Sequence, residues 1–221
     1  MTTLQQTSLS TATHQSRRRL LPKQWQYLKA PEREVLFSGA YGAAKSVALC
    51  MKLMVHAVVP GNTVGLFRKT LVSLKGSTMR TLLEGDSSMP AALPYDQFGV
   101  PLFEHNKSEG IIRIFDGGSI RLMGLDDEYK LGSYAFGAIG VDEVTELTEA
   151  EWLKLMSRIR LPIYTPASGL TNQIFGASNP DAPTHWAYGR FFGHDAASHS
   201  RRVISTRSFD NPFLVPSYKQ W

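Results

Sequence analysis

The chain has 221 residues, of which 43% are apolar and 10% aromatic, a composition that is ordinary for a globular protein and excludes a fibrous one. Its single cysteine excludes an internal disulfide, and its longest apolar stretch, residues 46–59, is too short for the ~20 residues of a membrane span. The formal net charge is +5, and no apolar run near the N-terminus indicates a secretory signal. We therefore expect a cytoplasmic globular protein that contacts no membrane.

The positive charge is concentrated in the N-terminal part of the chain. Residues 1–80 contain 12 Lys and Arg against 2 Asp and Glu, whereas residues 81–156 contain 5 against 14. Residues 1–19 are mostly polar and include three consecutive arginines, which predicts a flexible basic tail before a folded domain over residues 20–221. The basic excess indicates either a solvated surface or contact with nucleic-acid phosphates, and composition alone leaves both open.

The first predicted elements are a strand, a loop and a helix. Residues 35–37 form an apolar run of the β type, and residues 46–58 carry apolar side chains at helical spacing until Pro60 and Gly61 end the helix. Residues 63–67 predict the next strand. This order is the beginning of a βαβ unit, which predicts parallel strands.

A second helix and a β-hairpin follow. Residues 71–83 predict the helix, and residues 111–115 and 119–123 alternate apolar and polar side chains as paired strands do. Between these strands, Asp116 precedes two glycines that we expect to supply the positive φ of a tight turn. The chain therefore predicts an α/β fold with a mainly parallel sheet, flanking helices and an added antiparallel hairpin.

The last predicted strands carry polar residues at their ends. Residues 138–141 are almost entirely apolar, as a buried central strand requires, and they end in Asp142 and Glu143. Residues 148–159 predict a helix that begins with a capping-box pattern. Residues 173–177 predict another short strand, which is followed by a Ser-Asn-Pro turn.

The loop after the first strand is the first motif that indicates chemistry. Its sequence is Gly39-Ala40-Tyr41-Gly42-Ala43-Ala44-Lys45-Ser46. This is a phosphate-binding pattern in which Ala44 replaces the usual second glycine. The loop N–H groups and the helix N-terminus supply partial positive charge, Lys45 is placed to reach the β and γ phosphates, and Ser46 to ligate Mg²⁺. A plain strand-to-helix turn of small residues is the alternative, but such a turn does not require a lysine at a helix start.

The acidic pair Asp142-Glu143 is the partner that such a loop requires. A Mg²⁺ ion that bridges the β and γ phosphates favours a carboxylate on a neighbouring strand tip, which assigns Asp142 to the metal. Glu143 is then placed to orient and deprotonate the attacking water as general base. Acidic pairs after strands also occur by chance, so this assignment depends on the phosphate loop upstream.

Two further polar groups are candidates for contact with a nucleotide. Ser178 and Asn179 follow a strand and are placed to contact the γ-phosphate, although Asn-Pro is also an ordinary turn sequence. Gln24 precedes the first strand by about ten residues, and its amide offers both a donor and an acceptor to an adenine edge. An isolated glutamine is also common as a surface residue.

These elements, in this order, resemble the large terminase subunit of tailed bacteriophages over residues 21–218. The resemblance is carried by Gly65-Leu66-Phe67-Arg68-Lys69-Thr70 with Ser73-Leu74-Lys75, by Phe115-Asp116-Gly117-Gly118-Ser119 and Met123-Gly124-Leu125-Asp126, by Ser178-Asn179-Pro180 with His185-Trp186, and by Phe209-Asp210-Asn211-Pro212-Phe213-Leu214. It implies an ASCE-type P-loop ATPase, which in this family is the motor domain that moves double-stranded DNA into a procapsid.

The resemblance also implies ligands, partners and residue roles. It implies ATP and Mg²⁺ as ligands, with Gln24 as the adenine-motif residue, Lys45 and Ser46 as the phosphate-loop pair, Asp142 and Glu143 as metal ligand and base, and Ser178 and Asn179 as the coupling motif. The implied partners are double-stranded DNA, the portal protein, the small terminase subunit and neighbours in a homo-oligomeric ring, all in the host cytoplasm. Full-length members continue into a nuclease domain, which we expect to be absent from this chain.

Two departures from the family pattern concern positive charge. Family loops carry an arginine where Tyr41 stands, and the register of the family's arginine finger falls on Gly132. The nearest cation is Lys130, and we expect Lys130 or Arg121 to substitute for the arginine finger at the site of a neighbouring subunit. Further candidates are Arg158 and Arg160.

Two other functions fit part of the pattern. A helicase-like ATPase uses the same core and would act on nucleic acid without packaging it, but it does not explain the C-terminal signature. A non-catalytic module that binds DNA or portal would hold nucleotide weakly or not at all, and the altered loop residues Tyr41 and Ala44 favour it. Steady-state phosphate release, compared with that of a Lys45→Ala control, separates a catalytic from a non-catalytic protein.

Overall fold

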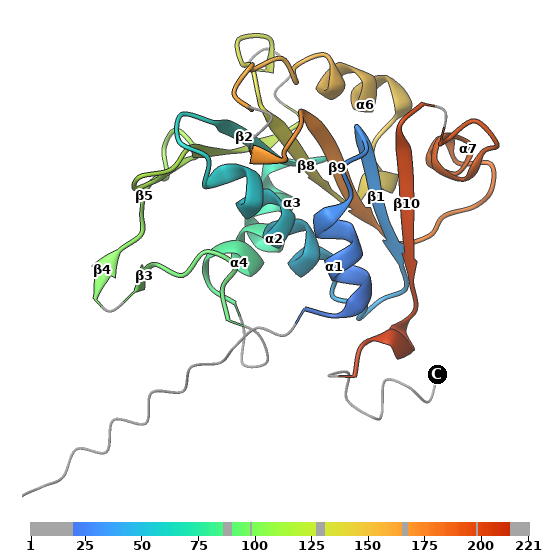
Figure 1. The fold of residues 1–221 in the computed structure, drawn as a ribbon, viewed down its shortest axis with the longest axis horizontal. Helices are drawn as coiled ribbons and strands as arrows, with labels where there is room; N and C mark the ends of the chain where they lie inside the picture. Colours follow the sequence, from blue (N-terminus) through green and yellow to red (C-terminus); the bar gives the residue numbers. More distant parts are fainter. Residues whose placement is uncertain are drawn as a thin grey trace, which may run out of the picture.

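The computed structural model describes residues 20–85, 90–97, 99–126, 131–164, 168–197 and 199–212. Within them, an eight-stranded sheet carries helices on both of its faces (Figure 1). The tail predicted for residues 1–19 lies outside the described residues, and so do the last two residues of the C-terminal signature.

The elements follow one another along the chain in an α/β order. The strands of the large sheet are β1 (Glu34–Gly39), β2 (Thr63–Arg68), β5 (Phe103–Asn106), β6 (Ile111–Ile114), β7 (Ser119–Gly124), β8 (Ala138–Asp142), β9 (Gln173–Ser178) and β10 (Arg201–Thr206). The helices are α1 (Pro22–Lys29), α2 (Lys45–Ala57), α3 (Leu71–Gly76), α4 (Thr78–Leu83), α6 (Glu149–Met156) and α7 (Trp186–Phe192). The short elements are β3 (Asp96–Gln97), β4 (Val100–Pro101), and the 3-10 turns η1 (Val144–Glu146) and η3 (Ser208–Asp210).

The large sheet has the strand order β10-β1-β9-β8-β2-β7-β6-β5. The six strands from β10 to β7 run parallel, and β6 pairs antiparallel with both β7 and β5. This arrangement confirms the predicted fold, a mainly parallel sheet with an antiparallel addition. Because the central strands are parallel, the C-terminal ends of β1, β2, β8 and β9 meet at one edge of the sheet, called here the carboxyl edge; the opposite edge is the amino edge.

Buried apolar side chains form one layer on each face of the sheet. The first layer joins α1, α2, α3 and α4 to the sheet and includes Tyr27 and Leu49. The second joins α6 and α7 to the other face and includes Trp152 and Phe191. Central strands that are covered on both faces must be apolar throughout, which explains the uninterrupted burial of β1 and β8.

The helix α2 lies in the first layer, and its buried polar groups include Cys50 and Lys52. Cys50 has no exposed surface, and its Sγ lies 3.8 Å from the carbonyl oxygen of Thr78. The Nζ of Lys52 donates to the carbonyl oxygens of Tyr27 and Ala30, both at 3.0 Å, and burial lowers the pKa of Lys52 to about 8. This cation satisfies carbonyl groups at the C-terminal end of α1 and thereby ties α1 to α2.

A buried ionic cluster fixes the amino edge. Glu34, the first residue of β1, is 2% exposed and accepts hydrogen bonds from Arg190 at 2.6 and 2.9 Å, from Arg201 at 2.9 Å and from Trp152 Nε1 at 2.8 Å. Burial alone would raise the pKa of Glu34, but these hydrogen bonds lower it below its ordinary value. The cluster joins β1 to β10, α6 and α7.

Two local predictions were wrong. The helix predicted over residues 71–83 is divided into α3 and α4, because Ser77 leaves the helical conformation with φ −131° and ψ −78°. In the hairpin turn, the positive φ of 56° belongs to Asp116 and not to the glycines after it. Gly118 is instead required by a close approach, since a Cβ there would collide with the carbonyl oxygen of Asn62.

One predicted helix start is confirmed. The capping box of α6 is present, with the Thr148 hydroxyl accepting from the backbone N–H of Glu151 and the Glu151 carboxylate accepting from that of Thr148. Among the helices that the structure describes, none is long and apolar enough to cross a membrane.

Candidate functional site

The phosphate loop of residues 39–46 begins at the carboxyl edge, where β1 ends. Two of its residues have left-handed backbone conformations, Gly42 with φ 75° and Ala44 with φ 53°. Glycine adopts this conformation freely, whereas a residue with a Cβ does so at a steric cost, so Ala44 is strained. The helix α2 begins at Lys45, directly after it, and its first N–H groups give the loop the partial positive charge of a helix N-terminus.

Lys45 joins the phosphate loop to a second strand tip. Its Nζ donates to the carbonyl oxygen of Ala40 and to the side-chain oxygen of Asn179, both at 2.8 Å, and Asn179 directly follows β9. Burial lowers the pKa of Lys45, and the neighbouring Glu143 and Asp142 oppose that shift. The predicted phosphate-loop lysine, acidic pair and coupling-motif asparagine therefore lie together.

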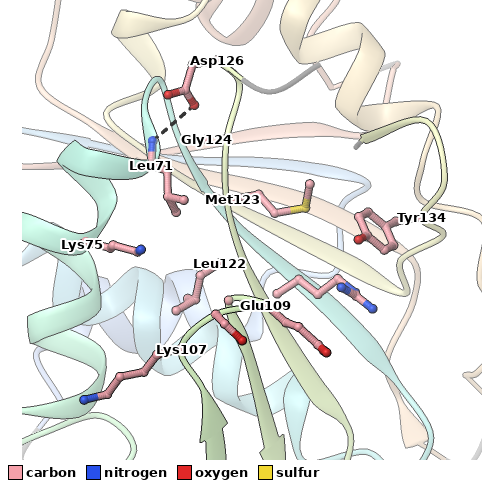
Figure 2. Close-up of a pocket in the computed structure, with 12 residues that line it drawn as sticks. Leu71, Lys75, Lys107, Glu109, Leu122, Met123, Gly124, Asp126 and Tyr134 are labelled. Atoms are coloured by element: carbon pink, nitrogen blue, oxygen red, sulfur yellow. Dashed lines mark hydrogen bonds between the residues drawn. The ribbon is translucent and has the colours of Figure 1, made fainter. Parts of the chain in front are cut away.

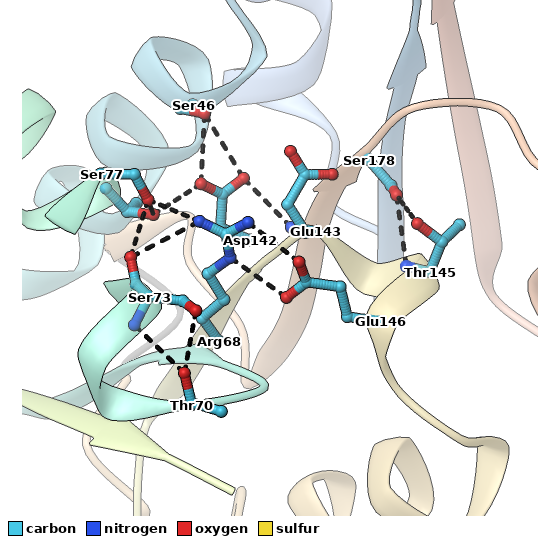
Figure 3. A network of polar contacts seen from close by, with 11 residues as sticks. Ser46, Arg68, Thr70, Ser73, Ser77, Asp142, Glu143, Thr145, Glu146 and Ser178 are labelled. Atoms are coloured by element: carbon cyan, nitrogen blue, oxygen red, sulfur yellow. Dashed lines mark hydrogen bonds and ion pairs between the residues drawn. The ribbon is translucent and has the colours of Figure 1, made fainter. Parts of the chain in front are cut away.

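Asp142 is the buried centre of a polar network at this edge (Figure 3). It ends β8 and is 3% exposed. The hydroxyl of Ser46 lies 3.2 and 3.4 Å from its two carboxylate oxygens, and the hydroxyl of Thr78 donates to it at 2.6 Å. Burial raises the pKa of Asp142, and the hydrogen bonds from Thr78 and Ser46 oppose that rise. The two residues predicted to hold a metal are thus within hydrogen-bonding distance of each other.

The contact of Thr78 with Asp142 was not predicted. Thr78 is the first residue of α4 and is fully buried, and only the break between α3 and α4 directs its hydroxyl toward the end of β8. The sequence did contain a signal for this break. Ser77 and Thr78 are adjacent helix-capping residue types in the middle of the apparent helix.

Glu143 has an unusual backbone conformation for a residue with a side chain. Its φ is 51° and its ψ is 60°, a conformation that costs energy and is concentrated at functional sites. Burial raises the pKa of Glu143, the charge of Asp142 raises it further, and Arg68 and Lys45 lower it. Within the described part of the chain, no residue donates a hydrogen bond to its carboxylate, which leaves that group available to a ligand or a water molecule.

Arg68 connects the turn that follows the acidic pair to the break between α3 and α4. It ends β2 and donates to both carboxylate oxygens of Glu146, at 2.9 and 3.1 Å, and to the hydroxyl of Ser77 at 2.7 Å (Figure 3). Its charge lowers the pKa of both Asp142 and Glu143. Arg68 belongs to the Arg-Lys-Thr stretch of the sequence, for which no role had been predicted.

Ser178 binds the turn that follows the acidic pair. Its hydroxyl lies 2.8 Å from that of Thr145 and accepts a hydrogen bond from the Thr145 backbone N–H at 3.2 Å. The neighbouring Asn179 contacts Lys45. The predicted coupling motif therefore contacts the acidic turn with one residue and the phosphate loop with the next.

The amide of Gln24 is engaged within the protein. Its oxygen accepts from the backbone N–H of Leu21 at 2.9 Å, and its nitrogen donates to the carbonyl oxygen of Ala44 at 3.1 Å. Gln24 thus supports the phosphate loop, and its predicted contact with adenine stays a prediction. A pocket of about 190 Å³ lies beside it, lined by Leu21, Pro22, Lys23, Gln24, Phe37, Ala43, Thr206 and Asp210.

The finger candidate Arg121 lines a different and larger pocket, of about 530 Å³, beside β7 and α3. Figure 2 shows this pocket, with Leu122 of β7 and Lys75 of α3 among its lining residues. Its guanidinium lies over the ring of Tyr134, 4.0 Å from the ring centre. In the sheet, β7 is four strand positions from β1, which is about 19 Å at the usual strand spacing. Arg121 therefore lies away from the phosphate loop of its own chain.

The other finger candidates also lie away from that loop or outside the described residues. The backbone groups of Arg158 and Arg160 bind those of Phe136, just before β8, which places both arginines at the amino edge. Lys130 lies outside the described residues. The action of any of these cations at the site of a neighbouring subunit stays a prediction. Tyr41, which replaces the family's loop arginine, is 68% exposed and offers no charge.

The oxygen atoms of Ser46 and Asp142 suit magnesium. Mg²⁺ prefers oxygen ligands, keeps several waters and is usually bound through one or two protein groups together with substrate phosphates. Among the described residues, there is no group of three or more His, Cys, Asp and Glu that would form a metal site on its own. The two oxygen groups at the phosphate loop fit a metal that binds together with phosphates.

Residues 32–221 match the sequence family described as phage terminase large subunit. The chain belongs to that family. This membership confirms the resemblance found in the sequence. No curated protein matches the sequence.

Solved terminases have the same fold. The large terminase of a thermophilic bacteriophage has a TM-score of 0.71 and 15% identity, with 92% of this chain and 49% of that chain covered. The same terminase in complex with ATP-gamma-S gives a TM-score of 0.69, 14% identity and coverages of 91% and 48%. The large terminase of bacteriophage HK97 has a TM-score of 0.59 and 8% identity, with 86% of this chain and 39% of that chain covered. The chain thus spans about half the length of the thermophilic-phage terminase.

Proposed function

We propose that the chain is the ATP-hydrolysing motor domain of a phage terminase, which couples hydrolysis of Mg-ATP to movement of double-stranded DNA into a procapsid. Family membership supports this function, and the thermophilic-phage terminase of similar fold forms complexes with ATP-gamma-S and with ADP. The observation that carries the proposal is the convergence of three strand tips. Lys45 after β1, Asp142 at the end of β8 and Asn179 after β9 lie in one network.

Each group in this network has a chemical role in the proposed reaction. Lys45 and the loop N–H groups hold the β- and γ-phosphates. Ser46 and Asp142 are placed to hold Mg²⁺, which neutralises phosphate charge when bound. Glu143 orients the attacking water and accepts its proton, since its carboxylate is not engaged by another described residue. Asn179, which contacts Lys45, is placed to respond when the γ-phosphate leaves.

The proposal includes partners that act on the assembled motor. In the host cytoplasm, a ring of these chains would dock on a portal protein, receive DNA from a small terminase subunit and supply a cation to each neighbouring site. A mixture of Lys130→Ala and Glu143→Gln chains tests that cation, because complementary defects restore activity only if the residue acts in trans. Recovery of hydrolysis in the mixture is expected, and its absence at every ratio would reject Lys130.

Steady-state phosphate release tests the catalytic proposal. We expect hydrolysis by the wild type and none above background from Lys45→Ala. Glu143→Gln should abolish hydrolysis and leave the equilibrium dissociation constant for ATP within about twofold, because the carboxylate acts on water and not on the phosphates. If wild type equals Lys45→Ala even with DNA, portal and a full-length terminase, the chain is not an ATPase.

A second function is favoured by one observation, the altered phosphate loop. Ala44 holds a left-handed conformation, and Tyr41 replaces a cationic residue of the family pattern. A non-catalytic module that binds DNA or portal would tolerate both changes. Weak or absent nucleotide binding, with no turnover in the assembled motor, would favour this function over hydrolysis. A helicase-like ATPase would instead hydrolyse ATP in the presence of DNA, and addition of the portal protein would not raise its rate of hydrolysis.

A further inference from the structure

The C-terminal signature segment lies against the phosphate loop. Strand β10 pairs with β1 in parallel through the pair Gly39 and Thr206, so β10 ends where the loop begins. The two strands approach so closely there that a Cβ on Gly39 would collide with the side chain of Thr206. This close approach places whatever follows Thr206 beside the phosphate loop.

The residues after β10 turn over the loop. The carboxylate of Asp210 accepts from the backbone N–H of Arg207 at 2.8 Å and from the hydroxyl of Thr206 at 3.3 Å, which closes the turn around η3. Two side chains of this turn then reach the loop backbone. The hydroxyl of Ser208 donates to the carbonyl oxygen of Tyr41 at 2.9 Å, and the amide of Asn211 donates to that of Gly42 at 2.7 Å.

These contacts fix the direction of loop peptide groups. A peptide is planar and trans, so when its carbonyl oxygen is held on one side its N–H points to the other. Ser208 holds the peptide whose N–H belongs to Gly42, and on the opposite flank Gln24 holds the peptide whose N–H belongs to Lys45. A loop binds phosphate through N–H groups that point to a common centre. When these N–H groups already have that orientation before binding, the ligand loses less binding free energy to ordering the loop.

We propose that Ser208 and Asn211 form a loop clamp, that is, a pair of positioning residues that hold the phosphate loop in its phosphate-binding conformation. The proposal deepens the proposed nucleotide site and rests on it. Phosphates that bind the loop stabilise the clamp, and by the same linkage a clamp pulled away from the loop weakens nucleotide binding.

A purely structural role for this turn does not fit the exposure of its residues. None of the residues of η3 is buried, and Phe209, its largest side chain, is 67% exposed. The backbone pairing of β10 with β1 is complete at Thr206, before the turn starts. The turn therefore adds little to the apolar core, and the side chains of Ser208 and Asn211 donate to the phosphate loop.

Two measurements on the Ser208→Ala/Asn211→Ala double variant test the clamp. Without nucleotide, backbone amides of residues 40–46 should exchange with deuterium about five- to tenfold faster, the factor expected from two partly exposed hydrogen bonds. With ADP as the probe, the dissociation constant should rise by about the same factor, while unfolding in urea changes little. Wild-type exchange of the loop in the double variant would overturn the proposal.

Matched variants separate the clamp from general destabilisation. Asn172→Ala removes an asparagine whose amide donates to the carbonyl oxygens of Gly137 and Leu161 near the amino edge, so it should leave loop exchange unchanged. Ser208→Thr keeps the donor and should behave like wild type. Asn211→Asp removes the donor without removing volume and should reproduce the loss; if it does not, the clamp is rejected. If wild type binds no ADP, the proposed function fails, and amide exchange still decides the clamp.

Discussion

Glu34 and Asp142 are both carboxylates at the ends of buried parallel strands, and they are 2% and 3% exposed. Their surroundings are opposite. Glu34 at the amino edge is held by two arginines and a tryptophan, which lower its pKa. Asp142 at the carboxyl edge is held by hydroxyl and backbone N–H groups, and burial raises its pKa. Equal burial therefore does not give the two carboxylates equal roles.

The difference separates a structural carboxylate from one for which we propose a function. The charge of Glu34 is fully compensated inside the protein, so its cluster stabilises the sheet and leaves no group for a ligand. The charge of Asp142 is solvated by neutral donors, with Arg68 nearby but bound to Glu146. An incompletely compensated carboxylate next to a phosphate loop is what a magnesium-nucleotide site requires.

The largest effect that we expect is on stability, at the amino edge. Glu34→Gln keeps the side-chain shape but leaves the Arg190 and Arg201 guanidinium groups without their shared counter-charge. We expect the free energy of unfolding to fall by about 3–5 kcal/mol, the usual cost of breaking a buried pair on one side. Urea unfolding followed by circular dichroism measures it. The control is Glu84→Gln, which removes an exposed partner of Arg80 and should cost under about 1 kcal/mol.

At the carboxyl edge, the corresponding change should affect function more than stability. Asp142→Asn removes a poorly compensated charge, so we expect unfolding to require as much free energy as in wild type, or about 1 kcal/mol more. ATP hydrolysis should fall about 100-fold, and the dependence of nucleotide binding on Mg²⁺ should disappear. Titration of ADP with Mg²⁺ and with a chelator measures the second effect. A stability loss as large as that of Glu34→Gln would show that the two carboxylates are not different in kind.

A smaller effect is expected when only a hydrogen-bond donor to Asp142 is removed, which tests the environment of this carboxylate without changing its charge. Thr78→Val keeps the volume of the side chain and removes a buried hydrogen bond of 2.6 Å. We expect the Mg²⁺ concentration that gives half-maximal hydrolysis to shift by about tenfold, with Thr78→Ser close to wild type, because a hydrogen bond to a charged group contributes roughly 1.5–3 kcal/mol. An unchanged Mg²⁺ dependence in Thr78→Val would remove Thr78 from the site.

The smallest expected effect is on the pH dependence of stability. The folded-state pKa of Glu34 lies below its ordinary value, so its contribution is complete above about pH 4.5 and is lost as the pH falls through the folded value. As the pH falls below about 4.5, wild type should therefore lose stability more steeply than Glu34→Gln. Urea unfolding at several pH values measures this difference. Parallel curves for the two proteins would mean that Glu34 does not titrate in this range.

Most of the site could be predicted from the sequence because its residues follow local patterns. The phosphate loop lies between an apolar strand and a helix, and Asp142 and Ser178 each end a buried strand, so the parallel sheet alone brings them to one edge. Local patterns also predicted the central strands β1, β2, β8 and β9. The sheet edge β10 and the helices α1 and α7 were not predicted, because their sequences are short and mixed in polarity.

What could not be predicted depends on contacts between distant parts of the chain. The partners of Glu34, Arg190 and Arg201, are more than 150 positions away in sequence. The contact of the Gln24 amide with the carbonyl oxygen of Ala44 could not be predicted, because only the tertiary fold brings α1 against the phosphate loop. The contact of Gln24 with adenine stays a prediction. The break at Ser77 had a local signal, but the apolar spacing across residues 71–83 is as regular as in a continuous helix.

The buried position of Cys50 makes this protein convenient for fluorescence work. The chain has one cysteine, and its side chain has no exposed surface, so thiol-reactive dyes should leave it unmodified in the folded state. A single cysteine introduced at the exposed Phe209 would then carry the only label. Since Phe209 lies between the two donors that hold the phosphate loop, a dye at this position would report nucleotide arrival and departure in real time, one chain at a time.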